Sequence, residues 1–273
     1  MMIFLFSGSR AVFIACEALT ALFMMTRIYD GGTAASAALI LLIGSVISVI
    51  AANTYAGLLH HRALLVLYSM LNPEDFIKIY APLIGCKWIP ANVRFTLTAY
   101  LSNGYAAKGD FARAKELLDR APAAGKRQAL ACDLILCGNR ASIALAEGNA
   151  DEAEAQLKRM AQRMKTAPLP AKKRAAQEDI LKTQRAQLHI LRGACTLADC
   201  DVLRAESKKP GSALRRVELN CFIGRAYALL GENALAREYL TPAAGCKTVV
   251  WGKAAAEALR SLPSNAQPGS KKK

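Results

Sequence analysis

The chain has 273 residues, 53% of them hydrophobic, and a net charge of +15 at pH 7. This length holds one large domain or two small ones, and the hydrophobic fraction lies above the roughly 45–50% of ordinary soluble domains. The eight scattered cysteines do not resemble the dense disulfide framework of small secreted domains.

The apolar excess is concentrated in the N-terminal quarter. Residues 33–52 carry no charge, and twenty residues of helix span ~30 Å, about one hydrocarbon thickness. Residues 11–28 form a second apolar run, with Glu17 near its middle. Because Tyr29-Asp30-Gly31-Gly32 has turn chemistry, the sequence predicts a transmembrane helical hairpin within residues 1–57, with spans at about 11–28 and 33–52.

Polar side chains inside the hairpin are expected to pair. Glu17 and Ser45 each lie fourteen residues from Gly31, so they reach the same membrane depth, and Ser45 or Ser48 can then satisfy the carboxyl group. Two alternatives stay open: Glu17 reaches the interface, or the first helix only dips into the membrane.

The charges that flank the spans predict the orientation. Arg10 precedes the first span, Arg62, Lys78 and Lys87 follow the second, and Arg27 is balanced by Asp30 in the connection. Positive charge favours the cytoplasmic side, so we expect a cell-membrane protein with two spans and a cytoplasmic C-terminal body.

Residues 58–88 are predicted to form a pair of capping or juxtamembrane helices. The apolar helix continues from His60 to Leu71, and both His60 and His61 are expected at the interface. Asn72-Pro73-Glu74-Asp75 is a helix start, with a cap, proline at the first position and acids at the positive end of the helix dipole, so a second helix should reach Ile84.

The rest of the chain contains a repeat. TAYLSNGYAAKGDFARAKELL (98–118) aligns with NCFIGRAYALLGENALAREYL (220–240) on Gly109 and Gly231, and CGNRASIALAEGNADEAEAQL (137–157) follows on Gly148. Gly193 marks a degenerate copy, in which Ala198 follows the glycine by five residues as Ala114 does in the first. Each copy predicts two helices joined by a glycine turn, and such a pair must stack on its neighbours to bury its apolar face.

The motifs Tyr105-Ala-Ala-Lys-Gly109-Asp-Phe-Ala-Arg-Ala114 and Gly224-Arg-Ala-Tyr227-Ala-Leu-Leu-Gly231-Glu-Asn-Ala-Leu-Ala236 resemble tetratricopeptide repeats. The resemblance covers residues 89–262 and implies an all-α α-solenoid. The turn glycines lie 38 to 45 residues apart rather than the usual ~34, so the helices or loops are longer. Together with the anchor, the chain resembles membrane-tethered tetratricopeptide proteins of bacteria.

In that family the first helices of the repeats line a concave groove that holds peptides. By position, the resemblance places four polar residues there: Asn103, Asn139, Ser142 and Arg225. The two asparagines resemble part of a carboxylate clamp, but Ala99 stands where such a clamp has lysine.

The positive charge lies almost entirely in the body. Residues 1–62 contain three basic and two acidic residues, a sum of +1, which leaves +14 for the remainder. Several basic residues of the body stand next to one another in the sequence. Solvation or contact with anionic lipid is a better use for these basic clusters than nucleic-acid binding, because few aromatic side chains interleave with them. The basic surface is predicted at Lys172, Lys173, Arg174, Lys208, Lys209, Arg215 and Arg216.

No reaction chemistry is apparent in the sequence. The three histidines form no recognisable catalytic arrangement, and no phosphate-binding glycine loop occurs. Cys132 with Cys137, and Cys195 with Cys200, are five residues apart, and on one helix such residues point about 140° apart, which disfavours a shared metal ion. We therefore expect no cofactor, metal or small-molecule substrate.

These observations favour a membrane-anchored, non-enzymatic scaffold or adaptor that binds a protein or peptide partner. The alternative is a basic helical body that binds anionic lipid or RNA, and a third possibility, an enzyme, would need a site that the sequence does not reveal. Residues 263–273 are predicted to be a disordered basic tail.

Overall fold

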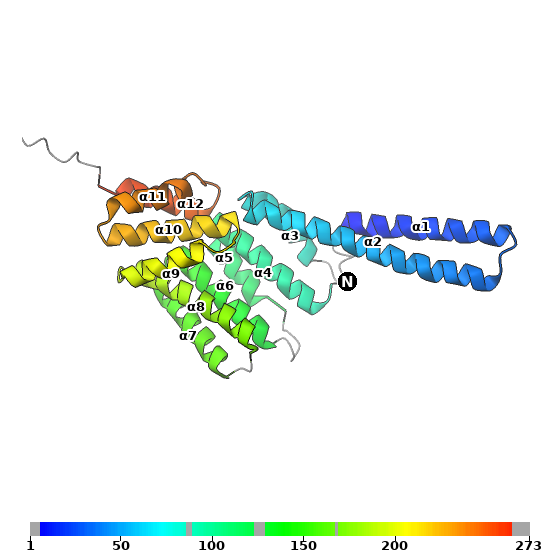
Figure 1. Ribbon diagram of the computed structural model, residues 1–273, viewed down its shortest axis with the longest axis horizontal. Helices are drawn as coiled ribbons and strands as arrows, with labels where there is room; N and C mark the ends of the chain where they lie inside the picture. The colour runs from blue at the N-terminus through cyan, green and yellow to red at the C-terminus, as the bar shows by residue number, and fades with distance from the viewer. Residues whose placement is uncertain (1–5, 86–88, 123–128, 167–168, 264–273) are drawn as a thin grey trace, which may run out of the picture. The chain divides into compact units, whose positions relative to one another are not determined.

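The structure is a computed structural model that describes residues 6–85, 89–122, 129–166 and 169–263. These residues form twelve α-helices and contain no strand, so the predicted all-helical class is confirmed for them (Figure 1). The predicted tail lies outside the described residues from Ser264 onward, as do residues 86–88 of the expected capping segment.

The chain divides into two compact units, residues 1–65 with 79–90 and residues 66–78 with 91–273. In the first unit, α1 (Ser7–Tyr29) and α2 (Ala34–Tyr68) are joined by a turn in which Gly31 has a φ of +80°. Only glycine adopts this left-handed conformation without steric cost. Helix α2 continues without a break past residue 57, the expected end of the anchor, because no proline interrupts it.

The helices α1 and α2 pack closely and expose large apolar side chains. A side chain added at Gly44 would collide with Thr20, so the backbones approach each other at this point. Leu19 and Leu42 are 66% and 65% exposed. Among the described residues, three helices are long and apolar enough to cross a membrane: α1, α2 and also α6 (Ala129–Glu147), which was not expected from the sequence.

Helix α3 (Pro73–Ile84) begins and ends where the sequence predicts. Asn72 caps it, since the Asn72 Oδ1 accepts a hydrogen bond of 3.1 Å from the Asp75 N–H. Within the first unit, Tyr80 is fully buried and its hydroxyl oxygen lies 2.6 Å from His60 Nδ1. Burial lowers the pKa of His60, and the neighbouring His61 lowers it further.

The second unit contains four helix pairs and a final helix. Each pair turns at a glycine with positive φ: +96° at Gly109, +87° at Gly148, +69° at Gly193 and +81° at Gly231. These are the four turn glycines that the repeat predicts. The pairs are α4 (Ala91–Lys108) with α5 (Phe111–Asp119), α6 with α7 (Ala150–Thr166), α8 (Ala171–Leu191) with α9 (Leu197–Ser207), and α10 (Ala213–Leu229) with α11 (Asn233–Ala244), followed by α12 (Val250–Ser261).

Small side chains let the helices of three pairs approach closely. Ala114, Ala153 and Ala236 are fully buried at equivalent positions. The expected equivalent in the degenerate copy, Ala198, is instead exposed, because α9 begins four residues after its turn glycine rather than two. Cys200, which is 1% exposed, occupies the buried position there.

The first helices of successive pairs contact one another, α4 with α6, α6 with α8 and α8 with α10. Helix α12 contacts both α10 and α4, so the last helix also lies against the first helix pair. The chain before α3 joins this packing: the Leu71 carbonyl accepts a hydrogen bond of 2.6 Å from the Thr248 hydroxyl.

Leu71 adopts a strained conformation. Its φ of +57° is left-handed, which costs a residue with a side chain about 1–3 kcal/mol. The conformation ends α2, because the Asn72 N–H bonds back to the Val66 carbonyl at 2.9 Å, as in helices that terminate at a left-handed residue. Glycine is the usual residue at such a position.

Candidate partner-binding site

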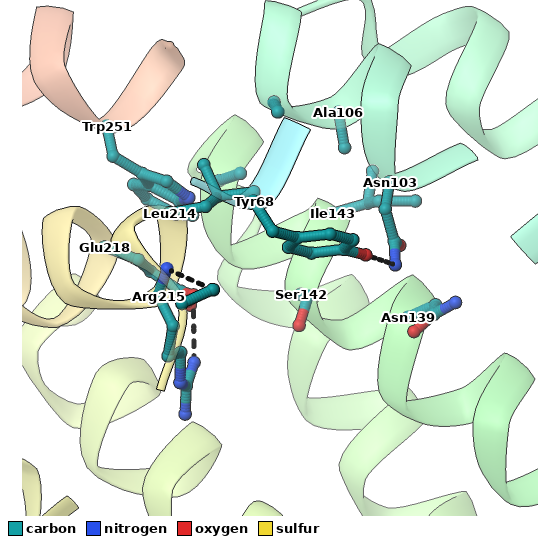
Figure 2. Close-up of a pocket in the computed structure, with 13 residues that line it drawn as sticks. Tyr68, Asn103, Ala106, Asn139, Ser142, Ile143, Leu214, Arg215, Glu218 and Trp251 are labelled. Carbon is teal, nitrogen blue, oxygen red and sulfur yellow. Dashed lines mark hydrogen bonds and ion pairs between the residues drawn. The ribbon is translucent and has the colours of Figure 1, made fainter. Parts of the chain in front are cut away.

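Three neighbouring cavities lie on the side of the second unit formed by the first helices of the repeats. The first, about 170 Å³, is lined by α4, α6, α10, Trp251 of α12 and Tyr68 at the end of α2 (Figure 2). The second, about 290 Å³, lies among α6 to α10, and the third, about 180 Å³, lies between α4 and α6. All three share Asn139, and together we call them the polar recess, after the polar side chains that lie in their otherwise mostly apolar lining: Asn103, Asn139, Ser142, Gln184 and Arg215.

The repeat explains which side chains reach the recess. Asn103 and Ser142 each stand six residues before a turn glycine, and Asn139 and Gln184 stand nine before theirs. Residues three apart share one face of a helix, so equivalent faces of α4, α6 and α8 present polar groups to the same side. Gln184 was missed in the sequence, although the same offset from Gly193 identifies it.

Asn103 contacts a residue from outside the repeats. Its Nδ2 donates a hydrogen bond of 3.2 Å to the hydroxyl oxygen of Tyr68, whose ring points into the first cavity (Figure 2). The Tyr68 and Tyr100 rings lie edge to face with centroids 6.3 Å apart. Burial raises the pKa of Tyr68, so its hydroxyl stays protonated and can donate a hydrogen bond of its own.

Ser142 and Gln184 connect α6 to α8 beside the second cavity. The Gln184 Nε2 donates hydrogen bonds of 3.0 Å to the Gly138 carbonyl and 2.8 Å to the Ser142 hydroxyl. Gln184 is only 4% exposed, and its Oε1 has no hydrogen-bond partner among the described residues. Asn139 lines all three cavities. The recess therefore offers uncharged groups that can donate and accept hydrogen bonds.

An ion pair lies at the α10 side of the recess. Arg215 Nη1 donates to Glu218 Oε2 at 2.9 Å, and Gln187 Nε2 donates to the other carboxylate oxygen at 2.9 Å. Burial alone would lower the pKa of Arg215, but the charge and hydrogen bond of Glu218 outweigh it and leave this pKa raised. Arg215 was predicted as part of the basic surface, whereas the structure places it in the recess with its charge balanced.

The remaining predicted residues lie elsewhere. Arg225 does not line the three cavities; its guanidinium stacks over Phe222, 5.8 Å from the ring centroid. Lys209 forms ion pairs of 2.8 Å with Asp179 and Glu206, and Arg174 donates to the Met164 carbonyl. Four cations of the predicted basic surface are exposed and form no ion pair with any residue that the structure describes: Lys172, Lys173, Lys208 and Arg216.

The first unit contains the other predicted polar group. Ser45 lies 3.2 Å from Glu17 and bonds to it, whereas Ser48 donates to the Gly44 carbonyl of its own helix at 2.9 Å. The structure thus brings Glu17 to one of the two proposed serines.

Within the described residues, no group of three or more histidine, cysteine or acidic side chains is placed to hold a metal ion. The expectation that Cys195 and Cys200 share one helix is wrong, because Cys195 precedes the Thr196 N-cap of α9. Both cysteines are free thiols, and a side-chain hydrogen bond joins them. Burial, together with Cys200, raises the pKa of Cys195 to about 12, which keeps the thiol protonated and unreactive.

Comparison of the chain with protein-family models, curated proteins and solved structures gives no match.

Proposed function

We propose that the protein is a membrane-anchored, non-enzymatic adaptor that holds an extended segment of a protein partner in the polar recess. The supporting observation is that Asn103, Asn139 and Ser142 line neighbouring cavities, all three of which share Asn139. An extended peptide offers one N–H donor and one C=O acceptor per residue, and amide and hydroxyl side chains can pair with both.

The size of the recess favours a chain over a compact ligand. Each cavity is below the ~300–1,000 Å³ typical of small-molecule sites, yet the three follow one another across the first helices. Because Arg215 and Glu218 neutralise each other, the recess has no strong charge preference. An uncharged extended segment fits these properties.

The repeat architecture that we propose is tetratricopeptide-like. It is supported by four helix pairs, each with a turn glycine and three with a buried alanine at the expected offset, and by contacts between successive first helices. In such an arrangement each pair covers the apolar side of the next, and the first helices are left to form a binding surface.

We assign the membrane anchor to α1 and α2. Their most apolar windows are 0% and 11% buried, against 33% in α6. Helix α6 packs against α4, α5, α7 and α8 and carries Arg140, which pairs with Asp119 at 2.7 Å, so it belongs to the body. Two spans and the flanking basic residues support a cytoplasmic body.

The experiment is site-specific photo-crosslinking of the full chain in native membranes. A benzophenone amino acid is placed at Asn139, and, as a matched control, at the exposed Gln162 on α7. We expect one partner segment to crosslink at position 139 and not at 162, and Asn103→Ala to reduce its yield. Identical products from both positions would reject the proposal.

The four exposed cations without ion pairs favour a second candidate, binding of the body to anionic lipid. Such binding weakens steeply as salt is added, because exposed charges are screened within a Debye length. Co-sedimentation with phosphatidylserine vesicles separates the two. If the body binds anionic lipid, replacing Lys172, Lys173 and Lys208 by glutamine abolishes co-sedimentation with the vesicles. If the recess binds a partner segment, the same replacement leaves the crosslink at position 139 unchanged.

A further inference from the structure

We infer that Tyr68 is a built-in cover of the polar recess, which a partner segment has to displace in order to reach Asn103. The role of this cover rests on the proposed function. The covering itself does not, and it can be tested without a ligand.

The Tyr68 side chain reaches the recess from outside the repeats. Tyr68 is the last residue of α2, yet its ring lines the first cavity together with Asn103, Asn139 and Ser142 (Figure 2). Its hydroxyl takes the Asn103 Nδ2 hydrogen bond that a partner carbonyl would otherwise accept. The chain therefore occupies part of its own site with one aromatic ring.

The turn that follows Tyr68 is strained at Leu71. Leu71 is held in the left-handed region, and its carbonyl is fixed by Thr248 in the connection before α12. A residue with a side chain adopts this conformation only when its surroundings enforce it, and such strain favours release. Opening of the turn relieves the strain and withdraws Tyr68 in the same movement, so the covered state is poised for displacement.

The consequence is a coupling between the recess and α2. A partner that binds only the uncovered recess shifts the last turn of α2 away from its docked position, and by reciprocity anything that pulls this turn away exposes the recess. Helix α2 runs from Ala34, within the proposed anchor, to Tyr68, so the chain itself joins the cover to the anchor.

The test is the rate at which an uncharged maleimide alkylates a cysteine placed in the recess, measured by peptide mass mapping on the full chain in detergent. Ala106→Cys probes the first cavity, which Tyr68 lines, and Gln177→Cys probes the second cavity, which it does not. Both native residues are half-buried. We expect Tyr68→Ala to accelerate labelling at position 106 at least about tenfold and at position 177 hardly at all, because reactivity follows the uncovered fraction.

Unchanged labelling at position 106 in the Tyr68→Ala protein would overturn the inference. If both positions label faster, the substitution has loosened the whole unit, and Tyr68→Phe decides, since it keeps the ring and removes only the bond to Asn103. If Tyr68→Phe accelerates labelling at position 106 more than at position 177, the result supports the cover. If it changes the labelling of the two positions equally, the result rejects the cover. If the labelling rates show the cover but no partner crosslinks at position 139, the adaptor role is refuted and the cover is not.

Discussion

The Ser45 hydroxyl lies 3.2 Å from Glu17 Oε2 and joins the two long apolar helices by a side-chain hydrogen bond. The other carboxylate oxygen, Oε1, is buried without a hydrogen-bond partner among the described residues. Glu17 therefore depends on Ser45, while Ser48 bonds within its own helix.

Loss of this contact should weaken the hairpin. We expect Ser45→Ala to destabilise it by about 0.6–1.7 kcal/mol, the range of hydrogen bonds between membrane helices. Ser48→Ala is the matched control and should cost less, because it removes only a bond to its own backbone. The measurement is equilibrium unfolding in mixed micelles, followed by energy transfer between labels on α1 and α2. Equal effects of the two substitutions would contradict the assigned role of Ser45.

Strain at Leu71 predicts a difference in stability between two substitutions at this position. Leu71→Gly and Leu71→Ala both remove the side chain beyond Cβ, and both keep the backbone carbonyl that Thr248 binds. Only glycine adopts the φ of +57° freely, so the glycine variant should exceed the alanine variant by about 1–2 kcal/mol. Chemical unfolding of the two proteins in parallel measures the difference. An alanine variant as stable as the glycine variant would show that the turn relaxes without strain.

Acidification should destabilise the first unit through His60. Its folded-state pKa lies below the ordinary 6.5, so the unfolded chain binds more protons between the two values. The contribution of His60 to stability is thus complete above pH 6.5 and is lost as the pH falls toward the folded-state pKa. Thermal unfolding at pH 7.5 and 5.5 should show a drop in stability that His60→Gln removes and His61→Gln reduces only in part, because burial is the larger cause of the lowered pKa of His60 and His61 the smaller one. A drop that survives in the His60→Gln protein would assign it to another group.

The local pattern predicted the helix pairs because each turn needs glycine at a left-handed position, and Gly109, Gly148, Gly193 and Gly231 all occupy one. It failed at Ala198, where two extra residues before α9 shift the buried position to Cys200. An offset counted from the glycine holds only while the turn length is constant.

The candidate site was predictable only as far as the repeat reaches. Asn103, Asn139 and Ser142 face the recess because the helical period carries them there, whereas the same offset takes Arg225 to Phe222. Contacts with α10 depend on how that helix crosses its neighbours, and ridge-into-groove packing allows several crossing angles. The roles of Arg215, and of Tyr68 from outside the repeats, therefore had no signal in the sequence.

Arg215 and Arg216 are adjacent basic residues whose removal should change the free energy of unfolding by very different amounts. Arg215 pairs with Glu218, whose side chain is only 14% exposed, while Arg216 is exposed. Arg215→Ala leaves a largely buried carboxylate without its cation, which costs up to about 3–5 kcal/mol, whereas an exposed charge contributes within about 1 kcal/mol. Urea unfolding of both variants measures the contrast. Adding Glu218→Gln to Arg215→Ala should recover part of the lost stability, because the unpaired charge is removed. A double variant as unstable as Arg215→Ala would mean that the lost packing of the arginine stem, rather than the unpaired charge, destabilises the protein.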